Sequence, residues 1–219
     1  MKVVITGTSQ GIGFATALAF LRNDHDVIGL DIEEAPYSLL RYPNYDHYLC
    51  DVSDKTSFPK IDEVNILVNN AGVQEESSNL AVNLIGTINA TEMYALQPHI
   101  KSILNVASVS AHNGAEYPLY TASKGGVLAY TKWLAQEVAK YGATANSLSP
   151  GGVITPMTDD IWHDTKKRAA VLAETLLGKW ADAREIADWI YFICVTNESM
   201  TAQDIIIDNG ETAKYNFIQ

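Results

Sequence analysis

Short runs of β-branched and other apolar residues alternate along the chain with segments that place apolar residues at helical spacing. The apolar runs occupy residues 2–6, 26–30, 45–49, 64–68, 100–106, 143–148 and 203–207. The helical segments between them cover residues 12–22, 79–96, 120–141 and 183–195. Several of the runs are apolar on both faces, as in strands that helices cover on each side. The alternation predicts an α/β fold with a doubly wound parallel sheet of about seven strands and helices on both faces.

The chain of 219 residues contains no repeat and no linker, so we expect one domain over residues 1–219. The connection over residues 152–178 is the exception to the alternation, because it is long and polar. It carries Trp162, His163 and three consecutive basic residues at 166–168. A long connection at the carboxyl end of a parallel sheet is typical of a substrate lid.

Composition narrows the class of protein further. Twenty-six acidic against 15 basic residues give a net charge of −11, which repels nucleic acid and anionic lipid, so neither is expected as a partner. The longest aliphatic stretches are three residues, too short for a membrane span, and no secretory signal is recognisable. Cys50 and Cys194 lie too far apart for a metal or disulfide spacing, and no metal site is expected. These features predict a cytoplasmic protein.

A glycine-rich turn directly follows the first predicted strand. It reads Thr-Gly-Thr-Ser-Gln-Gly-Ile-Gly over residues 6–13 and opens a helix. Gly7 permits a tight turn, Gly11 lets the backbone approach a pyrophosphate, and Gly13 allows close packing of helix on sheet. The amides at the helix start then face the phosphates. The turn predicts a dinucleotide cofactor and a Rossmann-type fold.

The second predicted strand ends at Asp31, a position suited to the hydroxyls of the adenosine ribose. A carboxylate there repels a 2′-phosphate, and neither Gln10 nor Ile32 offers that phosphate a positive charge. NAD(H) is therefore the expected cofactor, with NADP(H) disfavoured. Asp51, after the third strand, can accept a hydrogen bond from the adenine amino group, although an ordinary turn aspartate would look the same.

Further motifs follow in order along the chain, at residues 69–72 (Asn-Asn-Ala-Gly), 105–108 (Asn-Val-Ala-Ser), 120–124 (Tyr-Thr-Ala-Ser-Lys) and 146–151 with Thr155. With the glycine turn, these motifs resemble the short-chain dehydrogenase/reductase family over residues 3–210. The similar subgroup contains 3-oxoacyl-carrier-protein reductases and NAD-linked alcohol dehydrogenases. Besides the three turn glycines and Asp31, the resemblance implies cofactor contacts from Ser9, Gln10, Ile12, Asp51, Val52, Asn70, Ala71, Gly72, Tyr120, Lys124, Pro150, Gly151, Val153 and Thr155.

Tyr120 and Lys124 lie four residues apart and thus on one face of a helix. A neighbouring ammonium and a bound nicotinamide favour the phenolate, so Tyr120 is the expected general acid/base, with Lys124 also holding the nicotinamide ribose. Ser108 can hydrogen-bond the substrate oxygen; Ser110 is a rival at a spacing less like the family's. Asn83 matches the family's helix asparagine, which binds a water, although an asparagine that caps a kinked helix would look the same. Only ten residues separate it from Gly72, about half the interval that the resemblance implies.

These residues predict hydride transfer between NAD(H) and a secondary alcohol or ketone. Two alternatives remain open: a 3-oxoacyl thioester reductase using NADPH, and a non-catalytic dinucleotide sensor, although a sensor would be expected to lose Tyr120 or Lys124. The family resemblance also implies a homodimer or homotetramer, with Tyr130 and Trp133 facing a partner subunit or packing in the core. His112, Glu116 and the basic residues at 166–168 can border the substrate or be solvated.

Overall fold

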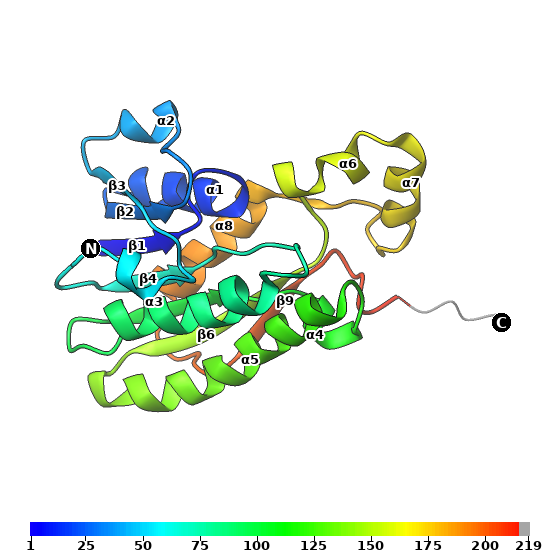
Figure 1. Cartoon of the computed structure of the whole chain (residues 1–219). Helices are drawn as coiled ribbons and strands as arrows, with labels where there is room; N and C mark the ends of the chain where they lie inside the picture. The colour runs from blue at the N-terminus through cyan, green and yellow to red at the C-terminus, as the bar shows by residue number, and fades with distance from the viewer. Residues whose placement is uncertain (215–219) are drawn as a thin grey trace.

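Seven parallel strands form one sheet in the order β3-β2-β1-β4-β5-β6-β9 (Figure 1). The computed structural model describes residues 1–214. The predicted α/β class and strand number are confirmed. The order reverses between β1 and β4, the position where such sheets open a crevice at their carboxyl ends. The strands are β1 (Lys2–Thr6), β2 (Asp26–Asp31), β3 (Tyr45–Leu49), β4 (Ile66–Asn69), β5 (Ser102–Val106), β6 (Thr144–Pro150) and β9 (Asp204–Ile207).

Two hydrophobic cores cover the two faces of this sheet. Because side chains alternate along a strand, Val3 and Ile5 of β1 point into one core and Val4 into the other. Helices α1 (Gly11–Leu21) and α8 (Ala183–Tyr191) close the first core. Helices α3 (Thr87–Tyr94) and α5 (Pro118–Val138) close the second. Figure 1 shows these helices on opposite sides of the strands.

Two of the predicted helices are not continuous α-helices, which corrects the sequence prediction. Residues 79–96 form a π-helix, η2 (Leu80–Gly86), followed by α3. Residues 183–195 form α8 and then a second π-helix, η5 (Phe192–Thr196). A π-turn is wound more widely, with i→i+5 hydrogen bonds, and the apolar spacing of these two segments did not distinguish it from an α-helix. Helix α5 ends in a short 3₁₀ turn, η3 (Ala139–Tyr141).

Between β6 and α8 the chain leaves the sheet and forms a projecting segment, drawn in yellow in Figure 1. Trp180 near its end lies against Gly152, where an added Cβ would be only 2.1 Å from the indole ring. Trp162 stacks on Trp180 with a centroid distance of 6.1 Å. The aromatic pair therefore fastens this segment to the end of β6. Its elements are β7 (Val153–Ile154), η4 (Pro156–Thr158), α6 (Asp159–Trp162), α7 (Thr165–Ala173) and β8 (Ala181–Asp182).

Shorter helices complete the described chain: α2 (Tyr37–Leu40), η1 (Lys55–Ser57) and α4 (Ser110–Asn113). Within residues 1–214, no helix has the length and apolar character needed to cross a membrane. Over the same residues, no three His, Cys, Asp or Glu side chains gather as a metal ion would require. Cys50 and Cys194 are buried free thiols.

Candidate active site

The glycine turn has no room for side chains at two of its glycines. Gly7 has a φ of 76°, and a Cβ there would lie 2.8 Å from Nδ2 of Asn70. A Cβ on Gly13 would lie 1.9 Å from the Gly7 carbonyl oxygen, so α1 packs directly on the turn. Helix α1 begins at Gly11, which also has a positive φ of 57°. The backbone is thus bare where a pyrophosphate would approach the helix amides, and the turn fits a dinucleotide.

Asn70 binds this turn to the neighbouring strand end. Its side-chain amide donates to the carbonyl oxygens of Thr6 (3.0 Å) and Gly7 (3.1 Å). The Thr6 hydroxyl oxygen accepts the backbone N–H groups of Asn70 and Ala71, both at 3.0 Å. These bonds hold the ends of β1 and β4 together at the point where the strand order reverses.

The carboxylate of Asp31 faces the turn from the end of β2. It accepts the backbone N–H groups of Ser9 at 2.8 Å and Glu33 at 3.0 Å. Asp51 accepts the N–H and hydroxyl of Ser53 through one oxygen, as an ordinary turn aspartate does, yet it also lines the cleft described next. Both readings of Asp51 from the sequence are thus compatible with its position.

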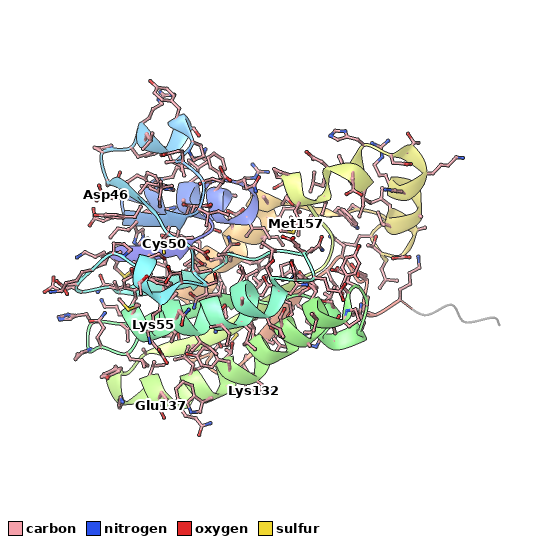
Figure 2. The ribbon with its side chains drawn as sticks, viewed as in Figure 1. Asp46, Cys50, Lys55, Lys132, Glu137 and Met157 are labelled. Carbon is pink, nitrogen blue, oxygen red and sulfur yellow. The ribbon has the colours of Figure 1, made fainter. Side chains whose placement is uncertain are left out.

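A cleft of about 920 Å³ runs along the carboxyl ends of the strands. Cys50, after β3, and Met157, in η4, line it and are labelled in Figure 2. Ser9, Gly13 and Asn83 lie outside its lining. The other residues predicted for cofactor binding or catalysis all line it: Gly7, Gln10, Gly11, Ile12, Asp31, Asp51, Val52, Asn70, Ala71, Gly72, Ser108, Tyr120, Lys124, Pro150, Gly151, Val153 and Thr155.

Ser108, Tyr120 and Lys124 meet in this cleft and are each at most 9% exposed. Ser108 follows β5, whereas Tyr120 and Lys124 lie near the start of α5. The Lys124 ammonium donates to the Val106 carbonyl oxygen at 2.9 Å and lies 5.7 Å from the centre of the Tyr120 ring. The rival Ser110 is fully buried and does not line the cleft, so Ser108 is the serine that a substrate oxygen can reach.

Burial shifts the pKa values of Tyr120 and Lys124. It raises the pKa of Tyr120 to about 12, and the negative charge of Glu116 acts in the same direction, while a hydrogen bond from Ser108 opposes both. Burial also lowers the pKa of Lys124 to about 8, partly offset by the Glu116 charge. Desolvation disfavours both the phenolate of Tyr120 and the ammonium of Lys124. A positive charge added to the cleft would lower the pKa of Tyr120 and so favour the phenolate.

Asn83 is buried inside η2 and clamps the loop that follows β4. Its Oδ1 accepts the backbone N–H of Val73 at 2.8 Å, and its Nδ2 donates to the Val73 carbonyl at 2.9 Å. Nδ2 also lies 3.2 Å from the Ser123 hydroxyl and 3.3 Å from Oδ1 of Asn79. Asn83 therefore does not cap a helix end. It positions the Gly72–Val73 backbone beside Lys124, because a Cβ on Gly72 would be 3.4 Å from Nζ.

The residues that the sequence left undecided take different places. His112 turns away from the cleft and contacts Asp204 at 2.8 Å. Lys167 pairs with Asp160, and Arg168 donates to the Trp162 carbonyl and lies over its ring. Glu116 lines the cleft, as do other residues that the sequence analysis did not single out, among them Gln74, Trp180 and Glu211. Gln74 follows the motif at residues 69–72 by two positions but is not part of it, and Trp180 and Glu211 lie far from every motif.

Comparison with known proteins agrees with this geometry. A family model described as "Enoyl-(Acyl carrier protein) reductase" matches residues 7–212. The chain is 32% identical to the 3-oxoacyl-[acyl-carrier-protein] reductase of Thermotoga maritima, over 94% of this chain and 96% of that protein. It belongs to the short-chain dehydrogenase/reductase family. As a member of that family, it is an NAD(P)-dependent oxidoreductase acting on CH–OH or keto groups.

Solved structures of dehydrogenases superimpose on nearly the whole chain. A putative 2-deoxy-D-gluconate 3-dehydrogenase from Agrobacterium tumefaciens, with bound NADP, is 27% identical with a TM-score of 0.87 and coverage of 97% and 96% of the two chains. A 4-hydroxyisoleucine dehydrogenase in complex with NADH is 26% identical with a TM-score of 0.88 and coverage of 98% and 100%. Both nicotinamide dinucleotides thus occur among these relatives.

Proposed function

We propose that the protein transfers hydride between NAD(H) and the carbinol or carbonyl carbon of a secondary alcohol or ketone. The observation that carries this proposal is the meeting of Ser108, Tyr120 and Lys124 in the cleft beside the glycine turn. Ser108 follows β5 and the other two lie on α5, and together they offer a hydrogen-bond donor, a proton carrier and a positive charge to a reacting C–O group.

Each of the three residues has a separate task. Ser108 hydrogen-bonds the substrate oxygen and orients it toward Tyr120. Tyr120 accepts the hydroxyl proton in oxidation and donates it in reduction. Lys124 supplies a positive charge that favours the phenolate, and with Val106 as its acceptor it is held in one orientation. The bound nicotinamide supplies the hydride acceptor or donor. Asn83 positions the loop at Val73, which borders the same cleft.

Removal of the Tyr120 hydroxyl tests this proposal. Tyr120→Phe keeps the ring and its packing, so turnover of a panel of secondary alcohols and ketones should fall at least about a hundredfold while dinucleotide binding persists. Turnover is followed by nicotinamide absorbance and binding by calorimetry. Tyr37→Phe is a matched control, because that ring lies on α2, is 79% exposed and does not line the cleft. A Tyr120→Phe protein with wild-type turnover would refute the assignment.

The preference for NAD(H) within this proposal rests on Asp31. Besides Lys124, no basic side chain of residues 1–214 lines the cleft, and Glu33 adds a further carboxylate near Asp31. A 2′-phosphate about 4 Å from a carboxylate is repelled by on the order of a few kcal/mol at a surface-like dielectric. That energy corresponds to roughly a hundredfold or more in affinity.

Titration of both reduced cofactors checks this preference. Wild type should bind NADH more tightly than NADPH. Asp31→Ala should bring the two affinities closer together, because it weakens the binding of NADH and removes the repulsion of the 2′-phosphate of NADPH. Asp46→Ala, an exposed carboxylate on β3 labelled in Figure 2, is the matched control and should leave the ratio of the two affinities unchanged. Tighter binding of NADPH by wild type would contradict the assignment.

A 3-oxoacyl thioester reductase is the second candidate, and the name of the Thermotoga relative favours it. The basic residues at 166–168 could have received an acidic carrier protein. Two of them are engaged within the projecting segment, Lys167 with Asp160 and Arg168 with Trp162. Of the three, only Lys167 is paired with a carboxylate, so the positive charge that faces a carrier is reduced to that of Lys166 and Arg168. Acyl thioesters in the substrate panel separate the two candidates directly.

A further inference from the structure

Carboxylates dominate the lining of the cleft. Among the described residues, eight acidic side chains line it, against Lys124 as the one basic side chain. Asp31, Glu33 and Asp51 follow β2 and β3, where the adenosine would lie. The others extend from the β4 end to the projecting segment: Glu75, Glu116, Asp160, Glu174 and Glu211. Asp160 is paired with Lys167, so the excess charge belongs mainly to the remaining four.

Glu116 lies beside the reacting group. It lies in the loop just before α5, with a φ of 73°, and its charge acts on the pKa of both Tyr120 and Lys124. Gln74 donates to its Oε2 at 2.9 Å. The loop before it is fixed because the Thr121 hydroxyl donates to the Ala115 carbonyl at 2.7 Å. Although the side chain reaches solvent, the cleft walls desolvate it and raise its pKa, and the negative charge of Glu211 adds to this rise.

Glu211 reaches the same space from beyond β9. Its Oε2 accepts the backbone N–H of Gly152 at 3.3 Å, which places it at the carboxyl end of β6. Burial raises its pKa, and the charges of Asp208 and Glu174 raise it further. The nearby Lys214 donates to the Ala173 carbonyl, and Lys179 pairs with Glu185 at 2.8 Å, so these cations are engaged elsewhere. Glu116 and Glu211 thus bring like charge to one cleft, where the Gln74 amide and the Lys124 ammonium offset part of the charge of Glu116.

A separate feature indicates where in this cleft a substrate would react. Ser108 and Tyr120 are polar side chains more than nine-tenths buried, and both line the cleft. If the proposed function holds, they receive the reacting oxygen. Groups attached next to the reacting carbon would then face Glu116 and Glu211. A positively charged group at that position reduces the repulsion between the two carboxylates. A neutral group leaves the repulsion unchanged, and an anion adds to it.

We propose that the natural substrate is a small amino alcohol or amino ketone, whose protonated amine lies between Glu116 and Glu211. This inference rests on the proposed function and adds the substrate class. The amine is unchanged in the reaction. In oxidation, the carbinol carbon loses hydride to the nicotinamide, and the hydroxyl proton passes to Tyr120, so the alcohol becomes a ketone.

Three matched alcohols test the substrate class at pH 7.5: 1-amino-2-propanol, 1,2-propanediol and lactate. They share a methyl carbinol and differ in carrying an ammonium, a hydroxyl or a carboxylate. With NAD⁺ and wild-type protein, kcat/KM should be at least about tenfold higher for the amino alcohol than for the diol, and lowest for lactate. Equal values, or a preference for diol or lactate that depends on Tyr120, would overturn the substrate class while leaving the proposed function intact.

A binding experiment decides the inference even if none of the three is oxidised. The Tyr120→Phe protein loaded with NAD⁺ is titrated with the same compounds, and the amino alcohol should bind at least about tenfold more tightly than the diol. Equal or weaker binding of the cation would refute the inference. Failure of wild type to oxidise or reduce any member of a broad alcohol and ketone panel would instead refute the proposed function.

Neutral variants locate the preference. In Glu116→Gln and in Glu211→Gln, the ratio of kcat/KM for the amino alcohol to kcat/KM for the diol should fall toward one. Each variant removes one charge and keeps the size of the side chain. Glu198→Gln is the matched control, because Glu198 is exposed, precedes the amino end of β9 and does not line the cleft at the carboxyl ends of the strands. Unchanged ratios in both cleft variants would place the source of the preference elsewhere and contradict this assignment.

Discussion

Lys124 belongs to the candidate active site, and its burial there lowers the stability of the folded protein. A lysine is ordinarily protonated well above neutral pH, yet burial lowers the pKa of Lys124 to about 8. In the unfolded chain its pKa returns to 10.5. The folded state therefore binds the proton less strongly than the unfolded state, and at pH 7 this difference opposes folding.

Replacement of Lys124 by methionine should stabilise the protein while abolishing turnover. Removing the buried charge at pH 7 gains on the order of 3 kcal/mol in the free energy of unfolding, less about 1 kcal/mol for the lost hydrogen bond to Val106. The gain should shrink as pH rises from 8 toward 10.5, because folded wild type has then already released the proton. Urea unfolding across this range measures it.

Lys132→Met provides the control for this prediction. Lys132 lies on the same helix, is exposed and is labelled in Figure 2. Its replacement should change the free energy of unfolding by no more than about 0.5 kcal/mol. A Lys124→Met protein that is less stable than wild type at pH 7 would show that the hydrogen bond outweighs the buried charge.

Among the individual residues, the sequence predicted much of the candidate site. The motifs located Ser108, Tyr120 and Lys124, and the structure brings them together. They could be found because each lies beside a strand end or a helix start, which the hydrophobic pattern marks. Glu211 could not be found in this way. It lies outside every motif, and only the tertiary fold places it beside Gly152.

Among the elements, helix α1 depends most strictly on its sequence. Its first turn lies directly on the Gly7 carbonyl, and Gly13 is the residue that makes this contact possible. Helix α5 contains Gly125, which has no atom within 4 Å of an added Cβ. The two helical glycines should therefore respond in opposite ways to the same substitution.

Gly13→Ala should separate α1 from the turn and abolish dinucleotide binding, with a loss of stability of at least about 1–3 kcal/mol. Gly125→Ala should stabilise the protein by roughly 0.5–1 kcal/mol, because alanine loses less backbone entropy in a helix. Thermal unfolding and NADH titration distinguish the two. A Gly13→Ala protein with normal NADH affinity would show that the turn can relax without losing its cofactor site.

The hydrophobic pattern predicts where helices lie but does not predict the two π-helices. The apolar pattern predicts helices at 79–96 and 183–195, and helical residues occupy both. It does not reveal the π winding of η2. Nor does it reveal the close approach at the end of η2, where a Cβ on Gly86 would lie 2.5 Å from the Val52 side chain. Such a contact joins residues 34 positions apart and has no local trace in the sequence.

For the whole molecule, exposed apolar side chains gather on two sides of the sheet. One set lies along η2, α3 and α5, and the other along α8, η5 and β9. Trp133 on α5 is 47% exposed, so it does not pack in the core of the subunit. Tyr130 stacks on it at 5.4 Å. We propose that these faces bind other copies of the chain, as patches of this kind commonly mark interfaces.

The oligomeric state can be measured by sedimentation at micromolar concentration. Wild type should sediment as a dimer or tetramer, and Trp133→Glu should shift it to a smaller species, because a charge would be buried without a partner. Tyr37→Glu is the control, since Tyr37 is 79% exposed on α2 and belongs to neither face. A monomeric wild type would assign Trp133 to the solvent-exposed surface.

The stacked pair Trp162 and Trp180 has an optical consequence. Trp180 lines the cleft, and Trp162 lies on it at 6.1 Å. Indole emits in the near ultraviolet, where reduced nicotinamide absorbs and oxidised nicotinamide does not. A reduced cofactor in the cleft would therefore quench this emission by energy transfer, whereas an oxidised one would leave most of it. The protein would carry its own fluorescent indicator of the redox state of what it binds, with no label attached.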